Sequence, residues 1–393
     1  MIIKTCQGKE VYKAFFSVLC ILAPVLQQYS FFGISWLIWG LFIMLPAGVK
    51  VLCDEKGIVV EKEMVLLLGY LMLYACVAIV YGQNVLGILQ IVFLVGMVAF
   101  FVPNLINNGV EKSYKYICII ATVYAILQLY VAKQFDFYLS GAFPIGNSPQ
   151  TAFANMANNG AAYVLRGLRP RSIFSEPSGY GIYVALFLFL LLCNKNLDRG
   201  KTVLAIFLSI GLVCARSSTG ILLMLLAWIG FYMRVVKHGK TNKCVAVLTI
   251  VIICVAIGGA ILSVESFEVF VQHTFSEKGG AYGRLVGYLY ALDFNNYSVS
   301  ELLFGHGVIK DFSTVFVAGW GRILYYFGIC GVVVYILLLV SYWMRGNTRQ
   351  RIVIAVVAIY AFFSAALYSV DIIWWWSVYF ALGDSKSEKI ILV

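Results

Sequence analysis

Runs of about 20 apolar residues follow one another along nearly the whole chain, and this pattern limits the fold more than any other feature. A helix of about 20 residues matches the ~30 Å hydrocarbon core of a bilayer. Successive runs leave little room for a soluble domain, so we predict one transmembrane domain over residues 1–393. We expect an all-α polytopic membrane protein with about 12 transmembrane helices. The runs lie at 12–29, 31–49, 64–81, 85–103, 115–132, 178–193, 202–215, 219–234, 244–263, 320–343, 352–370 and 372–383.

The composition supports a membrane protein and narrows the classes of function. Of the 393 residues, 62% are hydrophobic and 12% are charged, whereas about a quarter of the residues in a soluble domain are charged. The apolar runs hold almost no ionisable residue, which argues against a proton-coupled pump. Ten cysteines are present without metal-ligand spacing, so we expect packing roles and no metal. No small-residue cleavage site follows the first run, so we expect it to be retained as a helix.

The distribution of basic residues predicts the orientation. With both termini in the cytoplasm and the runs crossing alternately, the inner segments hold 20 of the 29 lysine and arginine residues. They also hold nine of the 18 acidic residues, so the whole formal charge of +11 falls on the inner side. Membrane proteins usually concentrate basic residues in their cytoplasmic segments. We therefore predict cytoplasmic N- and C-termini.

Two outer segments are long, whereas most inner connections are short. They span 133–177 and 264–318. Connections of this length are usually functional or disordered, and both segments contain aromatic residues throughout, which argues for order. We expect them to contribute to a functional site on the outer face.

The outer basic residues are mostly arginine, although inner ones are mostly lysine. Six of the nine outer residues are arginine, against five of the 20 inner ones. They lie near the outer starts of the sixth, eighth and tenth runs and in the two long segments. A helix that starts outside presents free N–H groups and the positive end of its dipole to the exterior. The six are Arg166, Arg169, Arg171, Arg216, Arg284 and Arg322.

Arginine at such helix starts predicts a phosphate-binding site. The guanidinium group is planar, keeps its charge and binds phosphate in a bidentate way. Pro177 suits the first turn of the sixth run, with Ser175 or Glu176 near its cap. The alternative interpretation is contact with lipid headgroups. We favour phosphate binding for the arginines at 166–171, whereas the two interpretations suit Arg216 equally well.

Two residues are candidates for a general base, and the sequence leaves the choice between them open. Glu176 is a carboxylate beside the arginines, and His306 lies between two glycines. Each also has a structural interpretation, because Glu176 can simply pair with an arginine and His306 can simply line a turn. The outer acids include no Asp-x-Asp pair, so we expect arginine rather than a metal to stabilise a departing pyrophosphate.

Four short motifs resemble the O-antigen polymerase (Wzy-type) family, which is related to the O-antigen ligases. The layout of about twelve helices with two long outer loops is also similar. The motifs cover only some 40 residues in loose patterns. They are Arg171-Ser-Ile-Phe-Ser-Glu-Pro-Ser-Gly-Tyr-Gly, Ala215-Arg-Ser-Ser-Thr-Gly220, Gly283-Arg284 and Leu303-Phe-Gly-His-Gly307.

The resemblance implies a metal-independent glycosyltransferase at the outer (periplasmic) face of the bacterial plasma (inner) membrane. It would transfer a growing glycan from undecaprenyl pyrophosphate to a hydroxyl of an incoming lipid-linked repeat unit, without a cofactor. Arg171, Arg216 and Arg284 would then contact pyrophosphate or glycan. We expect lipid-linked oligosaccharide and membrane lipid as partners, a chain-length regulator protein as a candidate partner, and no nucleic acid. Aromatic residues would stack on sugars: Tyr138, Phe143, Tyr282, Tyr288, Tyr290 and Trp320.

Two alternative functions stay open. The first is an O-antigen ligase, which would transfer finished glycan to another acceptor. Ligases of this group resemble one another in a histidine shortly before the helix after the second long loop, and 310–320 contains none. The second is a flippase for lipid-linked oligosaccharides, which would place charges along a path through the membrane. The apolar runs hold almost none.

Overall fold

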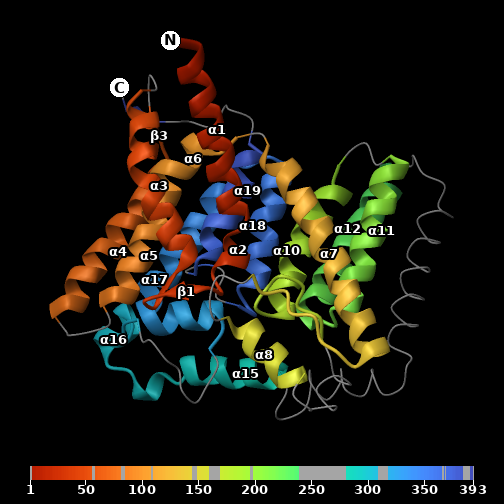
Figure 1. Ribbon diagram of the computed structural model, residues 1–393. Coiled ribbons are helices and arrows are strands. Elements are labelled where there is room, and N and C mark those ends of the chain that lie inside the picture. The colour runs from red at the N-terminus through yellow and green to blue at the C-terminus, as the bar shows by residue number, and fades with distance from the viewer. Residues whose placement is uncertain are drawn as a thin grey trace. The chain divides into compact units, whose positions relative to one another are not determined.

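The structure is a computed structural model, and it is mostly helical (Figure 1). Its contacts divide the chain into two compact units. The first unit comprises 1–23, 36–113 and 280–393, and the second comprises 24–35 and 114–279. The structure describes residues 2–54, 58–80, 85–107, 109–143, 148–158, 169–194, 198–238, 280–308, 317–364, 367, 369–383 and 390–392. The predicted run 244–263 lies outside these residues.

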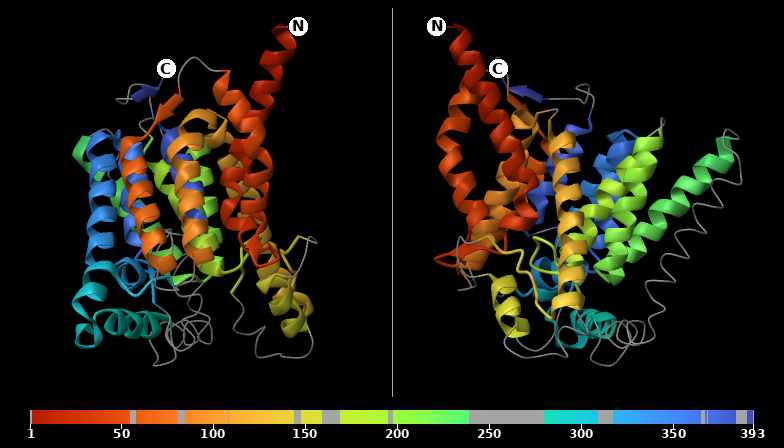
Figure 2. Two further views of the ribbon diagram at one scale, coloured as in Figure 1. Left: turned by 90° about the vertical axis from the view of Figure 1, so that its left-hand side faces the viewer. Right: turned by 45° about the vertical axis from the view of Figure 1, so that its right-hand side comes forward.

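The first unit is a helical bundle with a short helix, α15, across one end. Figures 1 and 2 show α15 at right angles to the bundle, and it packs against α17. Two short strands, β3 and β4, pair antiparallel. The elements are α1 (Ile2–Ile21), α3 (Trp36–Cys53), β3 (Ile58–Val60), α4 (Lys62–Val80), α5 (Val85–Gly96), the π-helix η1 (Met97–Phe101), α6 (Val102–Leu105), α15 (Gly280–Ala291), the 3-10 helix η2 (Phe294–Asn296), α16 (Val299–Phe304), α17 (Gly319–Arg345), α18 (Thr348–Tyr360), α19 (Asp371–Ala381) and β4 (Ile390–Leu392).

The second unit is built around α10, most of whose residues are buried. Helices α11 and α12 pack against it, and Tyr138 packs in an apolar cluster with Ala132 of α7 and Phe153 and Ala154 of α8. Its elements are α2 (Ala23–Leu26, whose first residue belongs to the first unit), β1 (Ser30–Phe31), β2 (Ile34–Ser35), α7 (Val110–Phe135, whose first turn belongs to the first unit), α8 (Pro149–Asn158), α10 (Pro177–Leu192), α11 (Arg199–Cys214) and α12 (Ser218–His238).

Most of each apolar run within the described residues is helical, which agrees with an all-α membrane protein. In the part of the chain that the structure describes, five helices are long and apolar enough to cross a membrane, and α10 is a shorter apolar helix. The total of about 12 spans stays a prediction. The five are Trp36–Cys53, Val85–Leu105, Val110–Phe135, Ser218–Val235 and Gly319–Arg345.

The predicted boundaries were wrong at three places. Helix α1 begins at Ile2 and ends at Ile21, whereas the first predicted run is 12–29. The run 31–49 begins as a β-hairpin, in which Ser30 pairs with Ser35 and the turn residues Phe32 and Gly33 both have positive φ. A two-residue turn of this kind suits the twist of the strands, but phenylalanine gives no sequence signal for it. The run 352–370 is helical only to Tyr360, and turns follow.

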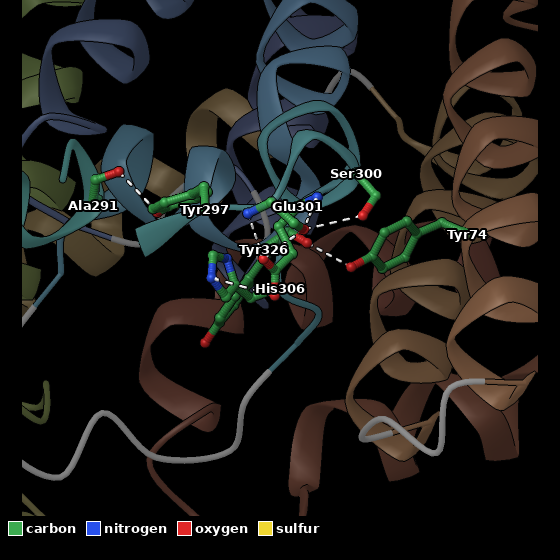
Figure 3. A network of polar contacts seen from close by, with 8 residues as sticks. Tyr74, Ala291, Tyr297, Ser300, Glu301, His306 and Tyr326 are labelled. Carbon is green, nitrogen blue, oxygen red and sulfur yellow. Dashed lines mark hydrogen bonds and ion pairs between the residues drawn. The ribbon is translucent and has the colours of Figure 1, made fainter. Parts of the chain in front are cut away.

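Helix α17 is broken at Gly328, which has φ 64 and ψ −167. The break frees carbonyl oxygens that a continuous helix would use, and other segments supply their donors. The backbone N–H of His306 donates to Tyr325 O at 2.8 Å, and Tyr74 donates through its hydroxyl to Tyr326 O at 2.5 Å (Figure 3). A Cβ on Gly305 would lie 2.2 Å from Tyr326 O. The two glycines therefore allow the loop backbone to pack directly on the broken helix.

A cluster of charges joins the start of α4 to the end of α17. Arg345 Nη2 lies 2.6 Å from Glu63 Oε2 and 4.0 Å from Glu61 Oε2. Tyr342 donates to Glu61 at 3.2 Å, and Ser341 donates to Glu63 at 3.1 Å. The carboxylate at a helix start and the guanidinium at a helix end also suit the two helix dipoles. The predicted topology, in which successive runs cross the membrane in alternate directions, places the start of α4 and the end of α17 on the inner side. The contact between them agrees with that topology.

Candidate anion-binding site

The starts of α10 and α12 lie side by side in the second unit because two glycines meet there. A Cβ placed on Gly220 would lie 2.9 Å from the Cα of Gly181, and a Cβ on Gly181 would lie 3.0 Å from the Cα of Gly220. Both glycines stand near the beginning of their helices. Small residues at a crossing let two helix backbones approach closely. The positive ends of two helix dipoles are thereby brought to one place.

Replacing Gly220 with valine is expected to separate these two helix starts. The added side chain has no room against Gly181, and overpacking of this kind costs about 1–3 kcal/mol. Thermal unfolding in detergent should show the loss. The matched control is Gly230→Val on the same helix, where a Cβ would meet nothing within 4 Å. Equal melting temperatures for the two variants would contradict a tight contact.

Arg169 and Arg216 meet at the junction of the two helix starts. Arg169 Nε donates to the carbonyl oxygen of Arg216 at 3.1 Å. Arg216 adopts φ 49, a conformation that is uncommon outside glycine, and Ser217 caps the first turn of α12 by accepting from the N–H of Gly220 at 3.2 Å. Burial lowers the pKa of Arg216 from its ordinary value. An acceptor anion at this point would offset the cost of burying the cation.

Arg171 lies on the ring of Phe153, with its guanidinium carbon 3.9 Å from the ring centroid. Its Nη1 donates to the carbonyl oxygen of Ser175 at 3.1 Å. Its Nε is buried and has no hydrogen-bond partner among the residues that the structure describes. Burial lowers the pKa of Arg171, while the electrostatic effects of Tyr138 and Glu176 oppose that shift. The side chain is therefore held in one place by stacking, with donor capacity unused within the described chain.

Glu176 is the N-cap residue of α10, and Pro177 follows it at the first helical position, as predicted. The Glu176 side chain does not cap the helix. It accepts from the hydroxyl of Ser178 at 3.0 Å and is exposed. An exposed carboxylate close to a cation can accept a proton from a substrate hydroxyl.

Arg284 and Arg322 lie in the first unit, near the start of α17. Arg284 Nε donates to Phe363 O at 3.3 Å, and Arg322 Nε donates to Val317 O at 3.1 Å. The first N–H groups of α17 bind other carbonyl oxygens, those of Ser364 and Ala361, both at 3.1 Å. This helix start is thus capped by the chain itself, which makes it less suitable for an anion than the starts of α10 and α12.

His306 lies in an aromatic cluster of the first unit. Its ring stacks on Tyr325 with centroids 4.5 Å apart, and Tyr297 meets it edge-on at 4.3 Å. Its Nε2 lies 3.9 Å from Glu301 Oε1, which is an ion-pair distance rather than a hydrogen bond. Hydrogen bonds from Ser298 lower the pKa of Glu301. Figure 3 shows His306 with Tyr297, Glu301 and Tyr326 of α17.

The structure places four of the predicted site residues in one unit and three in the other. Arg169, Arg171, Arg216 and Glu176 lie in the second unit, and Arg284, His306 and Arg322 lie in the first. Arg166 lies outside the described residues.

The predicted sugar-stacking role of Tyr138 was wrong. This residue is fully buried, and its ring packs against Phe153 with centroids 5.1 Å apart, so a sugar cannot reach its faces. Phe143, Tyr282 and Tyr290 remain more than 40% exposed. The sequence interpretation also gave no role to Gln128, whose contacts support this arginine cluster.

The helices define an all-α membrane protein. The adjoining starts of α10 and α12, with Arg169, Arg171 and Arg216, form its candidate anion-binding site. Comparisons with protein-family models, with curated proteins and with solved structures each found no match.

Proposed function

We propose that the protein is a metal-independent membrane glycosyltransferase that polymerises lipid-linked oligosaccharide repeat units. The observation that carries this proposal is the pairing of two helix starts, α10 and α12, with Arg169, Arg171 and Arg216 around them. Helix starts and guanidinium groups both favour phosphate oxygens. A membrane protein with such a site suits a substrate that joins an anionic pyrophosphate to a lipid.

The proposed reaction moves a glycan from one pyrophosphate to a hydroxyl. The acceptor oxygen attacks the anomeric carbon of the donor glycan, and the bond from that carbon to the pyrophosphate oxygen breaks. The general base takes the hydroxyl proton, and undecaprenyl pyrophosphate leaves with the bonding electron pair. The arginines stabilise the negative charge that develops on the departing pyrophosphate.

Glu176 is the better-placed of the two candidate bases. It belongs to the second unit with the arginine cluster, and its carboxylate is exposed. His306 packs between two tyrosine rings, and its backbone closes the break in α17. These contacts favour a structural role for His306.

Purified protein incubated with its lipid-linked repeat unit and a chelator is expected to produce a ladder of glycan lengths. Gel separation of the products measures it. Glu176→Gln should remove the ladder, because the amide cannot take the proton, whereas His306→Gln should retain it at lower protein stability.

Three other outcomes would contradict the proposal. Substrate that changes leaflet without new glycosidic bonds would identify a flippase. Glycan transfer only to a different acceptor would identify a ligase. A ladder that disappears with the chelator would show that the reaction needs a metal.

A further inference from the structure

Gln128 is a polar side chain inside an apolar helix. It stands in the C-terminal half of α7 and is completely buried. Burying an amide in an apolar environment is costly unless hydrogen bonds replace those to water. Polar residues within membrane helices therefore usually have a specific role. The partners of Gln128 indicate what that role is.

The amide of Gln128 binds two separate parts of the first long outer segment. Its Oε1 accepts from the backbone N–H of Ser172 at 2.8 Å, and its Nε2 donates to the carbonyl oxygen of Leu139 at 2.8 Å. A longer contact joins Nε2 to the carbonyl oxygen of Ser172 at 3.3 Å. Both the donor and the acceptor ends of one side chain are thus used, and together they bind the backbone at Leu139 and at Ser172.

One of these parts carries Arg171. Ser172 directly follows it and has φ 54, a left-handed conformation that costs about 1–2 kcal/mol for an L-residue. Gln128 bonds both backbone groups of Ser172, and the Ser172 hydroxyl donates to Ala121 O at 2.7 Å. These hydrogen bonds to α7 stabilise the left-handed conformation of Ser172, which is unfavourable on its own. The direction in which the Arg171 side chain leaves the backbone depends on that conformation.

The other part carries the surface on which the arginine lies. Leu139 follows Tyr138, and Tyr138 packs against Phe153 of α8. Asn158 of α8 also bonds Tyr138, since its Oδ1 accepts from the backbone N–H at 2.7 Å and its Nδ2 donates to the carbonyl oxygen at 3.0 Å. Phe153 is the ring that stacks on Arg171. Gln128 therefore binds the backbone next to Arg171 and also the backbone next to Tyr138, whose ring packs on the Phe153 that stacks on the guanidinium group.

We propose that Gln128 is a positioning residue, which fixes the guanidinium of Arg171 for the pyrophosphate of a lipid-linked substrate. It acts from within the apolar helix and through Arg171. This inference rests on the proposed function, because it assumes that Arg171 binds pyrophosphate. A residue that sets the geometry of another should lose its effect when that other residue is removed.

The structural part can be tested without any ligand. Hydrogen–deuterium exchange on the purified full-length protein should show faster exchange of the Ser172 amide in Gln128→Met, because its acceptor is gone. The matched control is Gln90→Met, the same chemical change in α5 of the first unit. Unchanged exchange in a peptide covering 169–176 would overturn the inference.

The functional part is tested by a double-mutant cycle with farnesyl pyrophosphate as the probe. Gln128→Met should weaken its binding roughly tenfold, and by less than about twofold when Arg171 is already alanine. A purely structural role would weaken binding equally in both backgrounds and would overturn the inference while leaving the proposed function intact. If Arg171→Ala alone leaves binding unchanged, Arg171 does not hold the pyrophosphate, and the proposed function loses its main residue. The inference would then fall as well, even with altered exchange at Ser172.

Discussion

Replacing Arg171 with alanine is expected to remove long glycan chains while single-repeat products persist. The guanidinium group is fixed on Phe153, and its Nε has no hydrogen-bond partner among the described residues. A fixed donor aimed at a developing charge avoids reorganisation during the reaction, and removing one such donor costs on the order of 10²–10³-fold in rate. The measurement is the initial rate of ladder formation with purified protein and lipid-linked repeat unit.

Two further variants separate geometry from charge. Arg171→Lys keeps the positive charge but loses the planar fork and its stacking on Phe153, so we expect only partial activity. Arg199→Ala removes an exposed arginine at the other end of the second unit, at the start of α11, and should leave the rate unchanged. Wild-type chain lengths from Arg171→Ala would rule out its role in the transfer.

Replacing Arg345 with methionine is expected to cause the largest loss of stability. Glu61 and Glu63 are 6% and 13% exposed, and Arg345 is the cation that the structure places against both. Removing one partner of a buried ion pair leaves an uncompensated charge and typically costs about 3–5 kcal/mol. Thermal unfolding of the purified protein in detergent should show the loss.

The matched control uses an exposed ion pair of the same unit. Arg349 binds Glu111 through two hydrogen bonds, at 2.7 and 3.1 Å, and the Glu111 carboxylate is 49% exposed, against 6% for Glu61 and 13% for Glu63. Exposed pairs contribute about 0–1 kcal/mol, so Arg349→Met should change stability little. Adding Glu63→Gln to Arg345→Met should recover part of the loss, because one buried charge is then removed. Equal melting temperatures for the two arginine variants would contradict the role of burial.

The sequence predicted the helices and several of their ends for clear physical reasons. Pro177 has a fixed φ and no N–H, so it suits the first helical position and marked the start of α10. The apolar run 219–234 marked the start of α12 to within one residue, and the structure shows that the Ser217 hydroxyl caps this start. The apolar runs were long enough to identify most helices by length alone. These features act locally, so they can be seen in one sequence.

Other features depend on partners far along the chain and could not be predicted. The break at Gly328 needs the loop around Gly305, and one glycine among several in an apolar run gives no sign of a break. The partners of Gln128 lie in loop segments up to 44 residues away. Tyr138 looked like an exposed loop aromatic, but the cluster around Ala132 and Ala154 buries it.

The candidate site was predicted only in part, because some of its contacts also involve residues far apart in the sequence. The spacing of arginines relative to helix starts indicated phosphate binding, and the glycine contact then brings two of those starts together. The sequence also suggested a third open start at α17. The carbonyl oxygens of Ala361 and Ser364 cap the start of α17. These two residues lie after the end of α18, in a stretch that the sequence predicted to be helical.

A cryo-electron microscopy map of the protein with undecaprenyl pyrophosphate tests the central claim most directly. We predict density for the diphosphate at the adjoining starts of α10 and α12, with the side chains of Arg169, Arg171 and Arg216 directed at its oxygens. A diphosphate bound elsewhere, with these three side chains directed away from one another into solvent, would contradict the account.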